Sequence, residues 1–337
     1  MSENGPRLVS LVPSITEILF ELGVGDRVVG VSHQCRYPPQ AREKPSLTRD
    51  RISLDDLARA AGGLLGDGTP SSAAIDEAYT RFRAAAGSPY ALDVQLLNEL
   101  APDVIFDQGL CDVCAIGETQ VDVAARVLAP APPLVVTISP TTLGEILESI
   151  RTIGEAARVP ERAEALVQSL AARVEAVRRR AARAASRPRV FCLEWLDPIW
   201  CAGHWVPEMV ALAGGEDRLG QPGAPSVRVA WERVVAEAPE VLVLMPCSFS
   251  VRRTLQELPA LARRPGWAEL PAVRHGRVWV VESGYFSHHS HRTVEGLEML
   301  AHAIHPELFP NRWGEHELVR LGSLHPLAPA LTRGEGE

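Results

Sequence analysis

The stretch that decides the fold is PRLVSLVPSITEILFELGVGDRVVGVSHQCRYPP, residues 6–39. Apolar, β-branched runs at residues 8–12 and 28–31 predict two strands. The segment between them is apolar on one face at helical spacing and predicts a helix. A strand, a helix and a second strand in this order are typical of a parallel α/β sheet.

The ends of this helix have recognisable sequence signals. Ser14 and Glu17 have the spacing of a capping box, so we expect the helix to open near Thr16. Gly23 and Gly25 are expected to close the helix and turn the chain into the next strand.

The same alternation of strands and helices continues along both halves of the chain. The predicted fold class is therefore α/β, with two lobes that each contain a mostly parallel sheet. The further strands are expected at residues 103–107, 134–138, 189–194, 241–245 and 277–281.

A helical segment at residues 141–186 separates the two halves. It is rich in Ala, Glu, Arg and Leu and is broken by Pro160. The part from residue 161 to 185 predicts a spine of roughly 37 Å between the lobes. We expect an N-terminal lobe at residues 1–140 and the spine at 141–187. The C-terminal lobe is expected at residues 188–310, with its last helix at 293–303, and an irregular tail at 311–337.

Composition excludes several kinds of partner. The net charge of −8 over 337 residues argues against nucleic acid, which normally binds a basic face. No apolar run approaches the roughly 20 residues of a membrane helix, so we expect no membrane insertion. The first residues, MSENGPRLVSLVPS, lack the pattern of a secretory signal. The sequence therefore predicts a cytoplasmic protein.

The opening stretch, together with PDVIFDQ, GHWVPEMVALAGGEDRLG, WERVVAEAPEVLVLMP and RVWVVESGYF, resembles the class III substrate-binding proteins that deliver cobalamin or ferric siderophores to ABC transporters. This resemblance spans about residues 7–305 and implies two α/β lobes joined by a helical spine. It also implies acidic docking residues on each lobe, near Asp55 or Asp56 and near Glu232. The missing export signal argues against docking to an ABC transporter.

A cytoplasmic, cobalamin-binding branch of that family is the more specific resemblance. Its marks are SHQCRYPP, LTRDRIS, DQGLCDVCA, EWLDP, GHWVPEM and MPCSF. The chain departs from the branch after Tyr-Phe, where SHHSHRT replaces an Asn-Arg-Pro-Gly-Pro stretch. Ligands of open parallel sheets bind beyond the carboxyl ends of the strands. The candidate ligand contacts in or beside these motifs are Ser14, His33, Tyr37, Arg49, Gln108, Glu194, Trp195, Trp200, Tyr285 and Phe286.

Four of the six cysteines follow predicted strands, at Cys35, Cys111, Cys114 and Cys247. In a reducing compartment they should be thiols. Together they could hold zinc or an iron–sulfur cluster. Alternatively, a single thiolate or imidazole could be the axial ligand of a corrinoid cobalt or haem iron. Cys192 lies within a predicted strand and is expected to be core packing.

Aromatic residues are scarce, yet three tryptophans lie within eleven positions. We expect Trp195 and Trp200 to reach a cleft between the lobes, where flat apolar walls suit a large planar ring. Trp205 is expected to start the next helix. Each histidine of His288, His289 and His291 is expected to be exposed, with a ligand or metal edge as the alternative.

Two functions remain open from the sequence. The first is a cytoplasmic carrier or sensor that holds cobalamin or a related corrinoid, a small-molecule metal complex, between the lobes. The second is a metalloprotein or enzyme with a Cys-ligated centre at the same place, with Glu194, Asp197 or His204 as acid–base groups. A siderophore or haem carrier is the third hypothesis, and the net negative charge of the chain argues against it.

Overall fold

The computed structural model describes residues 5–109 and 132–322. By its internal contacts the chain divides into two units. Unit 1 comprises residues Met1–Ala176 and His288–Glu295, and unit 2 comprises Val177–Ser287 and Gly296–Glu337. The division falls inside a long helix, and it assigns residues 288–295, near the C-terminal end of the chain, to unit 1. The two units are described separately.

Unit 1 contains a parallel sheet of four strands in the order β2-β1-β5-β6. All four predicted strands are confirmed, with β2 at the predicted residues and the others slightly shorter. Leu8 of β1 is fully buried and pairs with Val28 of β2 and Val104 of β5 on either side. The strands are β1 (Leu8–Ser10), β2 (Val28–Val31), β5 (Val104–Asp107) and β6 (Leu134–Thr137).

The helix after β1 is α1 (Pro13–Glu21). Its apolar residues Ile15, Ile18 and Leu19 are fully buried. Leu22 is the C-cap of the helix, and Gly23 adopts the left-handed conformation, with φ of +72°, as expected of a helix terminator. The remaining helices of the sheet region are η1 (Gly25–Arg27), η2 (Pro39–Glu43), α4 (Val94–Leu100) and α6 (Leu143–Ala156).

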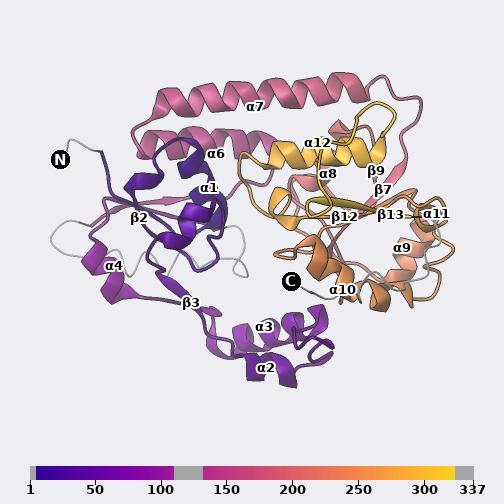
Figure 1. The fold of residues 1–337 in the computed structure, drawn as a ribbon, viewed down its shortest axis with the longest axis horizontal. Coiled ribbons are helices and arrows are strands. Elements are labelled where there is room, and N and C mark those ends of the chain that lie inside the picture. The colour runs from indigo at the N-terminus through magenta and orange to yellow at the C-terminus, as the bar shows by residue number, and fades with distance from the viewer. Residues whose placement is uncertain (1–4, 110–131, 323–337) are drawn as a thin grey trace, which may run out of the picture. The chain divides into compact units, whose positions relative to one another are not determined.

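Between β2 and β5 the chain forms a small module that the sequence did not predict. Strands β3 (Thr48–Asp50) and β4 (Tyr90–Leu92) pair antiparallel and carry helices α2 (Leu54–Arg59) and α3 (Ser72–Ala86) (Figure 1). The two helices enclose a core of their own. Its buried members are Ile52, Ala60, Ala74 and Ala78.

The helical spine is confirmed in outline. A break separates α6 from α7 (Pro160–Ala181), which begins at the predicted proline. The 22 residues of α7 give a length of roughly 33 Å. Arginines in its last turn and Glu161 in its first turn complement the helix dipole.

Unit 2 has a larger, mixed sheet in the order β10-β8-β7-β11-β12-β13, with β9 beside β7. The three predicted strands, β7, β11 and β12, are confirmed as its parallel centre. Within the tail that was predicted to be mostly irregular, a short strand, β13, pairs antiparallel with β12. The strands are β7 (Arg189–Trp195), β8 (Trp200–Cys201), β9 (Glu216–Asp217), β10 (Val227–Arg228), β11 (Val241–Leu244), β12 (Val278–Val281) and β13 (Leu318–Leu321).

The helices of unit 2 connect these strands. Trp205 is buried and caps α8 at its start, as predicted. The last helix, α12, begins at the predicted residue. In the part of the chain that the structure describes, no helix is long and apolar enough to cross a membrane. The helices are α8 (Val206–Leu212), α9 (Trp231–Glu237), α10 (Val251–Ala262), α11 (Pro271–Arg274), η3 (Ser283–Tyr285) and α12 (Thr293–Ile304).

Candidate ligand-binding site

The start of α1 lies at the carboxyl end of β1 and differs from the prediction. The helix begins at Pro13, whose fixed φ suits a first helical position, and Val12 is its N-cap without a side-chain bond. The expected capping box of Ser14 and Glu17 is therefore wrong. Both side chains instead contact the segment 288–295, which belongs to the same unit.

Glu17 is the charged centre of this contact. Its side chain is 1% exposed and accepts hydrogen bonds from Ser290 Oγ at 2.6 Å and His288 Nδ1 at 2.8 Å. Arg292 lies 3.6 Å away. Burial alone would raise the pKa of Glu17, but His288, Arg292 and Ser290 outweigh it, so this pKa lies below its usual value. Glu17 thus binds the segment as a carboxylate.

The next residue of the segment is buried against the strand ends. His289 is 2% exposed, and its Nε2 lies 3.1 Å from Ser14 Oγ and 3.3 Å from Gln108 Oε1. Gln108 directly follows β5, and Ser14 follows β1. Two predicted ligand contacts from neighbouring strands are therefore brought together, at the edge of the sheet where the fold class places ligands.

The expectation that each of these histidines is exposed was wrong. His288 and His291 are partly buried, with 27% and 15% of their side chains exposed, and His289 is fully buried. His291 lies 3.6 Å from Glu21, and burial lowers its pKa against the opposing effect of Glu21 and Glu17. The density of histidine in SHHSH was a sequence signal for this contact.

His33 follows β2 at the same edge. Its backbone N–H donates to Thr48 Oγ1 at 3.0 Å, and its Nδ1 lies 2.6 Å from the same oxygen. Its Nε2 lies 3.0 Å from the Gln34 amide nitrogen and 3.3 Å from Asp50 Oδ1. The ring also packs on Tyr90, at 5.5 Å between centroids.

Tyr37 presents an exposed aromatic face. Its side chain is 46% exposed, and the Arg292 guanidinium lies over the ring, 4.1 Å from the centroid. Arg49 is exposed on β3. The roles of Tyr37 and Arg49 as ligand contacts remain predictions.

The predicted cysteine ligands are only partly described. Cys35 is buried, 3.1 Å from Thr16 Oγ1, and burial raises the pKa of its thiol to about 12. Cys111 and Cys114 lie outside the described residues. Cys247 follows β11 in unit 2 and is half-buried. Among residues 5–109 and 132–322, no three His, Cys, Asp or Glu side chains are grouped to hold a metal ion.

In unit 2 the carboxyl end of β7 carries Glu194 and Trp195. Burial raises the pKa of Glu194, although Ser226 Oγ donates to its carboxylate at 2.6 Å. Trp195 packs on Phe249, at 5.1 Å between ring centroids. Trp200, on β8, lies under the Arg228 guanidinium at 5.4 Å. Both tryptophans are half-buried, so part of each ring remains open.

The last two predicted ligand contacts, Tyr285 and Phe286, are buried within unit 2. Tyr285 is 6% exposed, and its hydroxyl donates to Glu317 at 2.6 Å. Phe286 is 2% exposed, and its carbonyl accepts from Trp205 Nε1 at 2.9 Å. Cys192 is also fully buried, in β7, which confirms its predicted role in the core.

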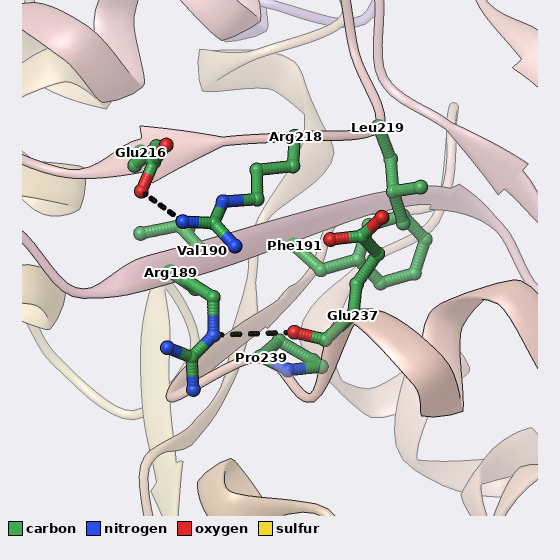
Figure 2. Close-up of a pocket in the computed structure, with 8 residues that line it drawn as sticks. All are labelled: Arg189, Val190, Phe191, Glu216, Arg218, Leu219, Glu237 and Pro239. Atoms are coloured by element: carbon green, nitrogen blue, oxygen red, sulfur yellow. Dashed lines mark hydrogen bonds and ion pairs between the residues drawn. The ribbon is translucent and has the colours of Figure 1, made fainter.

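A pocket in unit 2 is too small and wrongly placed to be the ligand site (Figure 2). Its cavity volume of about 10 Å³ holds roughly one water molecule. It lies at the amino end of β7, where Arg189 donates to the Glu237 carbonyl at 3.1 Å and Arg218 pairs with Glu216 at 3.0 Å. A cavity of about 290 Å³ in unit 1 is similarly at the amino ends of β5 and β6, beside Val104 and Leu134.

The family model for periplasmic binding proteins matches residues 8–284. The chain belongs to this family. Among characterised relatives of the periplasmic binding protein family, the Vibrio cholerae vitamin B12-binding protein is 24% identical, over 87% of both chains. An uncharacterised ABC transporter substrate-binding lipoprotein of Bacillus subtilis, YvrC, is 25% identical, over 90% of this chain and 81% of its own.

A solved member of the family has the same fold. The periplasmic heme-binding protein RhuT from Roseiflexus sp. RS-1 superposes with a TM-score of 0.64 at 25% identity, over 90% of this chain and 98% of its own. The predicted class III fold, with its two α/β units, is thus confirmed.

Proposed function

We propose that this periplasmic binding protein homologue binds cobalamin or a related corrinoid. The observation that carries the proposal is the match with the vitamin B12-binding protein, which extends over 87% of both chains. Haem is the alternative candidate ligand, because RhuT, whose sequence identity to this chain is similar, is named as a heme-binding protein.

The chemistry of the site favours the corrinoid over haem. Ser14 and Gln108 are buried and bonded to His289, whereas the partly exposed His33 offers an imidazole that suits the amide side chains of a corrin. The two carboxylates of a haem would instead call for cations. Arg292 is already bound to Glu17. In unit 1, Tyr37 is a partly open aromatic ring that suits a broad, flat ligand.

The binding proposal is tested with purified protein and two ligands, hydroxocobalamin and hemin. We expect hydroxocobalamin to co-elute with the protein and its visible spectrum to shift at micromolar concentrations. Tighter binding of hemin would assign the site to haem. No complex with either ligand would refute the proposal.

We also propose that the protein acts in the cytoplasm. The support is that Cys35, Cys192 and Cys201 are thiols that form no disulfide, which is usual in a reducing compartment. There, Asp55, Asp56 and Glu232 would not meet the outer face of a transporter. Fractionation of cells with an antibody to the protein tests this, and recovery with the periplasm or the membrane would contradict it.

The alternative of a Cys-held zinc or iron–sulfur centre depends on Cys111 and Cys114, outside the described residues. The thiol of Cys35 is protonated at neutral pH, since its pKa is about 12, so a metal would have to displace a tightly held proton. Metal analysis of protein purified without oxygen is the test. Stoichiometric zinc or iron that is lost in Cys111→Ser would favour this alternative.

A further inference from the structure

In unit 1, Arg292 lies over the aromatic ring of Tyr37. The guanidinium carbon is 4.1 Å from the ring centroid, well within the roughly 6 Å of a cation–π contact. Tyr37 stands between β2 and η2, whereas Arg292 belongs to segment 288–295. The contact therefore connects an aromatic residue that follows the carboxyl end of β2 to the stretch SHHSHRT, where the sequence departs from the branch that it resembles.

Only part of the Tyr37 ring is covered by this contact. Tyr37 is 46% exposed, whereas the Arg292 side chain is 12% exposed. A guanidinium at 4.1 Å excludes water from the face that it covers, so the exposed part of the ring lies away from Arg292. An open aromatic face with a support behind it is suited to stacking with a flat ligand.

Arg292 is itself held in place at both its backbone and its side chain. Its backbone N–H donates to Ser290 Oγ at 3.2 Å, and its Nη1 lies 3.6 Å from Glu17 Oε1. Ser290 Oγ in turn donates to Glu17 Oε2 at 2.6 Å. The buried carboxylate that binds segment 288–295 therefore also fixes the guanidinium that covers Tyr37.

The Tyr37 side chain depends on this support for its orientation. Among residues 5–109 and 132–322, its hydroxyl makes no hydrogen bond, and its ring stacks on Arg292. An exposed aromatic side chain that must be ordered on binding lowers affinity through lost rotamer freedom, whereas a ring that is already held avoids this cost.

We propose that Arg292 is a positioning residue, which stacks behind Tyr37 and holds the open face of the ring toward a broad, flat ligand. This inference rests on the proposed function and deepens it. A direct bond from Arg292 to an anionic group of the ligand is disfavoured, because the guanidinium is already beside the Glu17 carboxylate and is mostly buried. Arg292 thus acts on the ligand through Tyr37.

The experiment measures whether the effect of Arg292 depends on the Tyr37 ring. Arg292→Ala is made in the wild type, in Tyr37→Phe and in Tyr37→Ala, and the affinity of each full-length protein for hydroxocobalamin is measured by equilibrium dialysis. The control is Arg180→Ala in unit 2, which removes a guanidinium 5.2 Å from the centroid of the Phe309 ring. Circular dichroism checks that each variant is folded.

We expect Arg292→Ala to weaken binding about fivefold in the wild type and in Tyr37→Phe, the size of a partly exposed cation–π contact. In Tyr37→Ala the same substitution should cause no further loss, because the ring through which Arg292 acts is gone. Arg180→Ala should bind as the wild type does. If Arg292→Ala is unfolded, Arg292→Lys keeps a charge beside Glu17 without the planar guanidinium and should show the same pattern with a loss of about twofold.

A second readout reports on the ring without any ligand. The protein is labelled with 3-fluorotyrosine, and the signal of Tyr37 among the four tyrosines is assigned by its absence in Tyr37→Phe. Arg292→Ala should shift this fluorine signal, and Arg180→Ala should leave it unchanged.

Three results would overturn the inference alone: full affinity in Arg292→Ala, an equal loss in the Tyr37→Ala background, or an unmoved fluorine signal of Tyr37. Failure of the wild type to bind hydroxocobalamin or hemin would overturn the proposed function as well.

Discussion

Glu17 of the first helix and Ser290, 273 positions later, are joined by a hydrogen bond of 2.6 Å between two buried side chains. The bond attaches a segment from the far end of the chain to the first helix of unit 1. The same carboxylate also accepts from His288 and lies near Arg292. Glu17 is thus the anchor of segment 288–295 beside the strand ends.

Replacing Glu17 with Gln should destabilise unit 1 by about 3 kcal/mol, because His288 and Arg292 lose a buried carboxylate partner. All seven tryptophans lie in unit 2, so urea unfolding is followed both by far-ultraviolet circular dichroism and by tryptophan fluorescence. Circular dichroism should report the lower free energy of unfolding of unit 1 in Glu17→Gln. Glu21→Gln, at a half-exposed carboxylate, is the matched control and should cost less than about 1 kcal/mol. Equal stability of the two variants would contradict the anchoring role.

The anchor also predicts a dependence of stability on pH. The pKa of His291 is lowered from 6.5, so its contribution is complete above that pH and is lost as pH falls toward the folded value. The pKa of Glu17 is lowered from 4.5, so its contribution is lost in a second step, in more acid solution. The melting temperature of the wild type should therefore fall in both ranges. His291→Gln should remove the first step and Glu17→Gln the second; a wild type equally stable throughout would contradict both.

Glu194 in unit 2 predicts a dependence of stability on pH with the opposite sign, so that stability falls as pH rises. Its pKa is raised by burial, so its contribution is present below 4.5 and is lost as pH rises through the folded value. Glu194→Gln keeps an acceptor for Ser226 and should raise the stability of unit 2 at about pH 8, by tryptophan fluorescence. Glu216→Gln is the control, because Arg218 lowers the pKa of Glu216 and the substitution should bring no gain. A loss of stability in Glu194→Gln at this pH would contradict the assignment.

Much of the scaffold could be predicted because its signals are local. The β-branched run at Val28–Val31 and the break before Pro160 each depend on a few neighbouring residues. Strands β3, β4 and β13 were missed, because each forms by antiparallel pairing with a partner strand and lies outside the alternation of strands and helices that was used for the prediction. Such pairing is a tertiary effect that short runs do not encode.

The site was less predictable than the scaffold. The strand-end rule predicted His33 at the carboxyl edge of the sheet in unit 1, and the candidate contacts Ser14 and Gln108 lie at the same edge. It could not predict that His289 joins Ser14, because that contact spans 275 positions. A glutamate inside the apolar helix segment ITEILF was the available signal that Glu17 has a buried partner.

Tyr37 should contribute to ligand binding through its ring. Tyr37→Ala is expected to weaken corrinoid binding about tenfold, or roughly 1.4 kcal/mol, whereas Tyr37→Phe should retain affinity because the stacked face is kept. The melting temperature of both variants should change little, because the side chain is 46% exposed. Dialysis with hydroxocobalamin gives the affinities. Equal affinity in Tyr37→Ala and wild type would remove Tyr37 from the site.

The claim that this chain binds a metal-bearing macrocycle is tested most directly by titrating it with hydroxocobalamin. Absorption and tryptophan quenching are recorded together. We predict a saturable spectral change with one equivalent bound and a dissociation constant near or below about 1 µM. An unchanged spectrum and unquenched fluorescence up to about 100 µM, with hydroxocobalamin and then with hemin, would contradict the claim.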